Sequence, residues 1–190
     1  MIRKKQPLHD AKIASAALKL AASRGWKSVT LEAIAKSTKL PSSILKARFA
    51  SPYDLVPLIS AEIDREAFAH LSKMSGTPHD QLFDVLMARF DILQKYRKAI
   101  LSMAETARTD RPLSCALGRT TLDGLYRVID LVDITTPPRP ILAAGLGAIY
   151  SWAFVIWCKD NSRDMAKTMA AVDRGLRLTE KIVTLLKRHS

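Results

Sequence analysis

The sequence predicts an all-α protein with a short three-helix head, residues 1–55, and a longer helical body, residues 56–190. Two observations support this prediction. Apolar residues recur at helical spacing through most of the chain, in about nine segments. The chain has 190 residues and 48% of them are hydrophobic, so it can bury a substantial core and is not expected to be disordered.

The first predicted helix covers residues 9–24. Ile13, Ala16 and Ala17 lie on one face of it, with Leu20. Gly25 is suited to cap its C-terminus, and Trp26 then folds back over apolar surface. This helix would support the segment that follows.

Residues 29–49 predict two short helices joined by a tight turn. Thr30 can cap the first helix, and Pro41 suits the first turn of the second. Ile44, Leu45 and Phe49 form an apolar face, which leaves Ser42, Ser43, Lys46 and Arg48 outward. Such a pair is typical of a helix-turn-helix whose second helix enters the DNA major groove, but an ordinary helical hairpin has the same pattern.

The net charge of +12 is unevenly distributed. Residues 1–55 contain eleven Lys/Arg against three Asp/Glu, a net charge of +8, whereas the longer remainder carries only +4. A basic head beside a nearly neutral body indicates a polyanionic partner at the head. Basic surface that serves solubility alone is the alternative.

Residues 11–55, AKIASAALKLAASRGWKSVTLEAIAKSTKLPSSILKARFASPYDL, resemble the N-terminal domain of TetR-family transcriptional regulators. The shared pattern is an Ala-rich first helix that ends in Gly-aromatic, a Thr-capped second helix, a Leu…Phe recognition helix and a long fourth helix from Ser51. The resemblance implies a homodimer that binds a palindromic DNA operator and is released from it by a small apolar effector, as a repressor would be.

The chain departs from the family pattern at four positions. Lys39 replaces the usual turn Gly, so it must adopt positive φ or reshape the turn. Pro41 stands where the family usually has Ser, Lys46 where it has an aromatic residue, and Pro52 where it has Lys. In the family, that aromatic residue and that Lys normally hold phosphates. Lys46 could act instead as a point charge, and Ser51-Pro52 could begin a helix whose free N–H groups hold a phosphate.

The resemblance places the DNA contacts on the head. Base-edge contacts are expected from Ser42, Ser43 and Lys46, and phosphate contacts from Thr30, Lys39, Arg48 and Tyr53. The basic arm at Arg3, Lys4 and Lys5 could add a backbone or minor-groove contact, or be a frayed terminus.

The body predicts helices over residues 54–75, 79–94, 99–109 and 113–133, followed by a Pro-rich linker at 135–140. Aromatic and Met side chains on these helices and the next could line an effector cavity, or belong to the core. The expected pocket residues are Phe83, Met87, Phe90, Met103, Tyr126 and Trp152.

Residues 141–158 contain no charged residue over 18 positions, which is long enough for a membrane span. The run is rich in Ala and Gly and stands alone in a basic protein, so a helix buried at a subunit interface is the preferred interpretation. Together with a final amphipathic helix over 162–189, it would form the homodimer contact that the resemblance implies.

Two body segments, DQLFDVLMARFD (80–91) and WCKDNSRDMAKTMAAVDRGL (157–176), resemble the lipid-binding accessory protein of ubiquinone biosynthesis. That protein has a TetR-type fold but binds isoprenoid lipid instead of DNA. It is the alternative function, although its lipid cargo does not require the +8 head.

The sequence does not indicate an enzyme, a cofactor or a metal site. It lacks a P-loop and an HExxH motif, its four histidines are dispersed, and its two cysteines are 43 residues apart. The N-terminus has no apolar run of the kind found in secretory signals, so a cytoplasmic location is expected.

Overall fold

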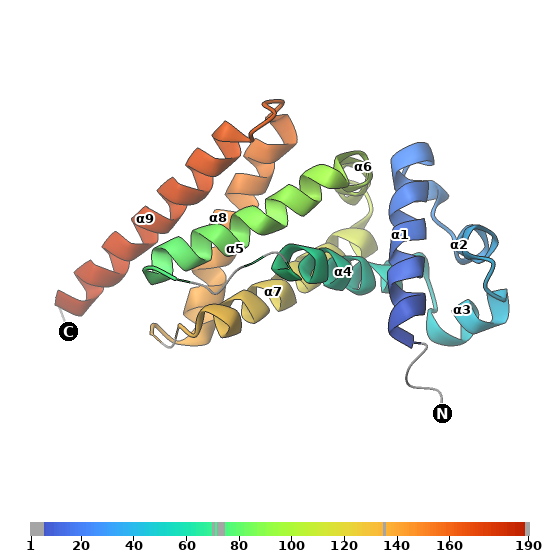
Figure 1. The fold of residues 1–190 in the computed structure, drawn as a ribbon, viewed down its shortest axis with the longest axis horizontal. Helices are drawn as coiled ribbons and strands as arrows, with labels where there is room; N and C mark the ends of the chain where they lie inside the picture. Colours follow the sequence, from blue (N-terminus) through green and yellow to red (C-terminus); the bar gives the residue numbers. More distant parts are fainter. Residues whose placement is uncertain (1–5, 70, 72–74, 135, 189–190) are drawn as a thin grey trace. The chain divides into compact units, whose positions relative to one another are not determined.

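The computed structural model describes residues 6–69, 71, 75–134 and 136–188. Within these ranges every regular element is helical, as predicted (Figure 1). The predicted basic arm at residues 3–5 lies outside them. The elements are α1 Gln6–Arg24, η1 Trp26–Ser28, α2 Leu31–Thr38, α3 Ser42–Arg48, η2 Pro52–Leu55, α4 Val56–Ala69, α5 Pro78–Lys95, α6 Arg97–Ala107, α7 Arg111–Val132, α8 Arg139–Lys159 and α9 Ala166–Arg188, where η marks a 3₁₀ turn.

Two predicted helices differ from the observed ones by four residues or more at one end. The predicted helix 54–75 begins as the 3₁₀ turn η2, capped reciprocally by Ser51 and Asp54, and ends at Ala69. The predicted helix 162–189 begins only at Ala166, because Met165 has φ 52° and a positive φ cannot continue a right-handed helix.

The chain forms two compact units that alternate along the sequence. Unit 1 contains residues 1–66 and 92–120, and unit 2 contains residues 67–91 and 121–190. Helices α4, α5 and α7 each contribute residues to both units. The predicted division at residue 55 separates a DNA-binding head from a ligand-binding body by their expected functions, and it stays a prediction.

In unit 1, α1, α2 and α3 form a tri-helical group, and α1 also packs along α6 (Figure 1). Trp26 is 3% exposed, and its backbone N–H donates to Ser102 Oγ on α6 at 2.8 Å. Gly25 has φ 82°, which lets the chain turn sharply between α1 and η1. The head is therefore joined to α6 by a hydrogen bond as well as by apolar packing.

In unit 2, α8 and α9 lie side by side as a helical hairpin (Figure 1). Gly175 on α9 makes this close packing possible, since a Cβ there would lie 2.8 Å from Cγ2 of Ile149. Phe90 of α5 is fully buried and stacks on Tyr150 of α8, with ring centroids 5.3 Å apart. These contacts give unit 2 an aromatic core.

The turn between α8 and α9 is organised by Asp160, which is 1% exposed. Its carboxylate accepts hydrogen bonds from the backbone N–H and hydroxyl of both Ser162 and Thr168. Burial by itself would raise the pKa of Asp160, but these four donors outweigh it and hold that pKa well below its ordinary value. The carboxylate thus fixes the end of α8 against the first turn of α9.

We expect Asp160→Asn to destabilise the protein, because the amide NH₂ would face donors that now meet a carboxylate. The loss should be roughly 1–3 kcal/mol, or a fall of about 3–10 °C in the melting temperature at neutral pH. A depressed folded-state pKa contributes stability above the unfolded-state value and loses it as the pH falls. The difference between wild type and variant should therefore shrink below about pH 4.

Thermal unfolding followed by circular dichroism from pH 3 to pH 7 measures this difference. Asp164→Asn is the matched control, since Asp164 is exposed in the same turn and should leave the melting temperature nearly unchanged. Equal melting temperatures for the Asp160 variant and wild type at pH 7 would contradict the assignment.

Candidate nucleic-acid interface

The turn between α2 and α3 has the geometry of a helix-turn-helix. Thr30 caps α2 as predicted, with its hydroxyl accepting from the Ala33 N–H at 3.1 Å. Lys39 ends α2 with φ 58° and ψ 27°, so this non-Gly residue does occupy the left-handed region. Pro41, predicted in the first turn of α3, instead precedes the helix as its N-cap. Lys39 is exposed, and its ammonium can reach solvent on the head surface.

Helix α3 is held against the head by Leu45 and Phe49, which are 1% and 6% exposed. Ser42 and Ser43 are exposed, as predicted. The prediction that Ile44 faces the core is wrong, because its side chain is 46% exposed. Leu45 and Phe49 are four residues apart and share one face, whereas Ile44 is turned about 100° from Leu45.

Lys46 lies on the exposed side of α3 and forms an ion pair with Glu32 of α2. The Nζ–Oε1 distance is 2.9 Å, and both side chains are more than half exposed. This pair lowers the pKa of Glu32, and the hydrogen bond from Lys46 is the largest cause. An ion pair this exposed is weak, so Lys46 can exchange the carboxylate for a phosphate.

Arg48 is held more firmly than Lys46. Both of its terminal nitrogens donate to the Asp10 carboxylate on α1, and its guanidinium lies 5.0 Å from the centroid of the Phe49 ring. The bidentate hydrogen bond to Asp10 raises the pKa of Arg48. Arg48 therefore fastens the end of α3 to α1, and a phosphate contact by Arg48 would have to compete with Asp10.

Tyr53, in η2, is half-buried and donates its hydroxyl to Asp110 Oδ2 at 3.0 Å. This contact raises the pKa of Tyr53. Asp110 also accepts from the Leu113 N–H at 3.0 Å and so caps α7. At the nearby Ser51-Pro52 start, the backbone N–H groups of Ala50 and Ser51 already donate to the Asp54 carboxylate.

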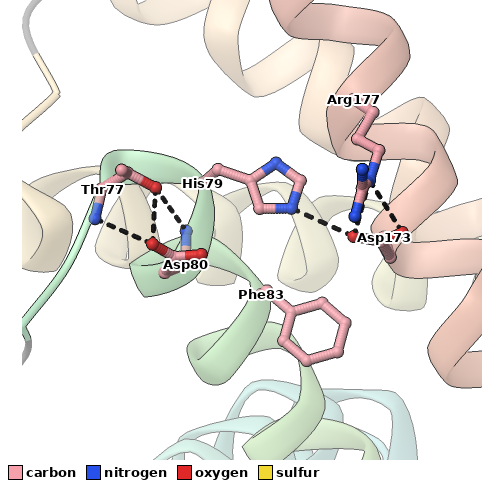
Figure 2. Close-up of a pocket in the computed structure, with 6 residues that line it drawn as sticks. All are labelled: Thr77, His79, Asp80, Phe83, Asp173 and Arg177. Carbon is pink, nitrogen blue, oxygen red and sulfur yellow. Dashed lines mark hydrogen bonds and ion pairs between the residues drawn. The ribbon is translucent and has the colours of Figure 1, made fainter.

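Unit 2 contains a cleft of about 540 Å³ between α5 and α9 (Figure 2). Its lining residues are Thr77, His79, Asp80, Phe83, Asp173 and Arg177. The Asp173 carboxylate accepts a hydrogen bond from Arg177 Nε at 2.9 Å and lies 3.2 Å from His79 Nε2. The contact with Arg177, and after it the contact with His79, holds the pKa of Asp173 below its usual value. The ring of Phe83 adds an apolar wall, so the cleft suits a small molecule with both an apolar and a polar part.

The six predicted effector residues are dispersed in the structure. Phe83 alone of the six lines the cleft. Met87 and Phe90 lie in the buried core of unit 2, and Met103 is buried in unit 1. Tyr126 is half-exposed with Arg139 over its ring at 5.6 Å, and Trp152 is 42% exposed on α8.

Helix α8 presents an open apolar stripe. Ile141, Trp152 and Val155 are 61%, 42% and 56% exposed, with exposed Ala144 and Ala148 between them at helical spacing. In the described residues α8 is the one helix long and apolar enough to cross a membrane, and a third of its apolar window is buried within the chain. This composition is also that of a helix that packs against another protein surface.

Besides the five cleft residues other than Phe83, several residues that contact the predicted site residues or lie near them were not identified from the sequence. Asp10, Glu32 and Asp110 are the carboxylates that meet Arg48, Lys46 and Tyr53, and three-dimensional packing decides these pairs. Arg89, 3% exposed in unit 2, lies 5.1 Å from the centroid of the Tyr150 ring. Gly124 leaves room for the Arg89 side chain, since a Cβ there would be 3.0 Å from Nη1 of Arg89. A glycine inside a predicted helix was the sequence signal that could have indicated this close approach.

Comparisons with solved structures identify the fold. A TetR transcriptional regulator from Nitrosomonas europaea superposes with a TM-score of 0.71 and 18% sequence identity, over 90% of this chain and 96% of that one. A TetR transcriptional regulator from Rhodococcus sp. RHA1 gives 0.69 and 17%, over 92% and 97%. No protein-family model and no curated protein sequence matches the chain. The chain therefore has the fold of the TetR-family transcriptional regulators.

Proposed function

We propose that the protein is a DNA-binding transcriptional regulator that acts as a homodimer and binds an operator through α3. The observation that carries the proposal is the exposed, basic α3 on a rigid tri-helical support, within a fold shared with TetR regulators. The comparisons give no support to the lipid-binding alternative, because the similar structures are transcriptional regulators.

In this proposal, Ser42, Ser43 and Lys46 face the base edges of the major groove, and Lys46 can also hold a phosphate as a point charge. Contacts with the DNA phosphates, which set the register of the protein on the DNA, would come from Thr30, Lys39, Arg48 and Tyr53. The hydroxyl of Thr30 already accepts from α2, so its contribution would come from a donated hydrogen bond. Two such heads related by a two-fold axis would bind two half-sites about one helical turn apart.

The second copy is proposed to cover the open stripe of α8. A lone exposed apolar residue is ordinary, but Ile141, Trp152 and Val155 form a continuous line with two alanines between them. The alanines allow close approach of a partner helix, and α9 would complete a four-helix contact with its symmetry mate. A small effector with an apolar part would bind more tightly to a dimer geometry in which the two heads are wrongly spaced for the operator, and it would therefore release the DNA. The protein would act in this way as a cytoplasmic repressor.

The proposal is tested by selection of bound duplexes from a random library with the purified full chain. We expect enrichment of inverted repeats whose half-sites are about 10 base pairs apart. Addition of a lipid extract should weaken the complex in a gel shift if the effector is apolar. Ser43→Glu should abolish enrichment, because Ser43 is exposed and a carboxylate there would repel the DNA. Copurified lipid together with no enriched DNA would support the lipid-binding alternative instead.

Lys46 and Glu32 allow a sharper test of the interface. Lys46→Ala should reduce the slope of log affinity against log salt by about 0.9 for each phosphate that the lysine no longer neutralises. Glu32→Gln should tighten DNA binding by about two- to fivefold at low salt, since Lys46 no longer exchanges a carboxylate for a phosphate. This gain should be smaller in the Lys46→Ala background.

Glu62→Gln is the charge-matched control for Glu32→Gln, because Glu62 pairs with Arg65 within α4. It should change affinity less than Glu32→Gln does. Equal gains from Glu32→Gln with and without Lys46 would show that the two residues are not coupled at the interface.

We expect Val155→Glu to convert the dimer to a folded monomer. The glutamate would place a buried charge in the proposed dimer contact, which disfavours association. The monomer should still fold, because Val155 is exposed in the single chain. Light scattering coupled to size-exclusion chromatography measures the mass. Leu122→Glu, on the 43% exposed Leu122 of α7, is the control and should leave the mass unchanged. A wild-type protein that is itself monomeric at micromolar concentration would refute the proposed contact.

A further inference from the structure

The outward side of α3 contains a large apolar side chain among polar ones. Leu45 points to the core, and Ser43 and Ala47 lie on the opposite side, both exposed. Ile44 and Lys46 flank them on either side, about 100° from Leu45. We define the reading face of α3 as Ser43, Ile44, Lys46 and Ala47.

The two basic side chains of α3 are already engaged within the head. Lys46 pairs with Glu32, and Arg48 is held by two hydrogen bonds to Asp10. Ile44 is 46% exposed, so a substantial part of its surface remains in contact with water. In the free protein, Ile44 is therefore the reading-face residue with the most to gain from an apolar surface.

Small residues at the centre of the reading face determine how closely α3 can approach a groove. Ser43 and Ala47 have short side chains, so the helix axis can come near the base edges. The branched side chain of Ile44 then reaches further than either of its neighbours. In the major groove, the C5-methyl group of thymine is the apolar group available to meet it.

We propose that Ile44 is a specificity-determining residue that contacts the 5-methyl group of one thymine in each operator half-site. This inference rests on the proposed DNA-binding function and deepens it. The contact distinguishes thymine from cytosine, which presents an amino donor and no methyl group in the major groove. Ser42, Ser43 and Lys46 would supply polar contacts around it.

Uracil substitution isolates this contact, because uracil differs from thymine only in the missing methyl group. Duplexes selected by the full chain are resynthesised with uracil in place of each thymine in turn. For the wild-type protein, uracil at one particular position of a single half-site should weaken binding about fourfold, the value for exposing one methyl-sized group. Replacement in both half-sites should weaken it about fifteenfold.

Ile44→Ala provides the matching protein change. This variant should bind the thymine duplex more weakly than wild type and show no further weakening when uracil is introduced at the same position. Its melting temperature should equal that of wild type, since the replaced side chain is exposed. Leu122→Ala, which removes an equally exposed apolar side chain from α7, should retain the wild-type uracil pattern.

The possible failures are distinguishable. If no duplex is enriched, the proposed DNA-binding function fails and this inference fails with it. If duplexes are enriched but the wild type tolerates uracil everywhere, or Ile44→Ala keeps the same uracil sensitivity, only the role of Ile44 is overturned. The role is also overturned if Ile44→Ala loses binding to anionic phospholipid vesicles while its affinity for the selected DNA is unchanged.

Discussion

A seven-residue helix forms too few internal hydrogen bonds to persist in water, so α3 depends on the packing of Leu45 and Phe49 against the head. This packing fixes which side of α3 faces outward and thus which side chains a partner can meet. The bidentate contact of Arg48 with Asp10 adds a second attachment, at the end of α3. The position of every proposed DNA contact on α3 follows from these two attachments.

The head is basic in composition, but part of its charge is neutralised locally. Glu32 and Asp10 lie against Lys46 and Arg48, and Asp110 accepts the hydroxyl of Tyr53. In the proposed complex, such a head would attract DNA through its overall field, while the contacts of Lys46, Arg48 and Tyr53 would compete with internal carboxylates. Apolar readout by Ile44 fits this arrangement, because it adds sequence discrimination that the internal ion pairs do not reduce.

The body combines rigid joints with an open surface. Asp160 fixes the turn between α8 and α9, and Gly175 lets the two helices approach closely. The α8 stripe remains uncovered, and the cleft beside Phe83 has both an apolar wall and paired charges. In the proposed dimer, these helices would carry a small displacement at the cleft to the subunit contact.

The sequence by itself determined the helical class, the order of the elements and the Thr30 cap, because helical periodicity and capping are local properties of the chain. It also indicated that Lys39 would take a positive φ or distort the turn. Only the tertiary structure decided that Ile44 is exposed and that Lys46 and Arg48 meet carboxylates from α2 and α1. The two ion pairs, like the dispersal of the predicted effector residues, depend on contacts between segments distant in the sequence, which helical periodicity cannot encode. The exposure of Ile44 was settled by which face of α3 packs against the head.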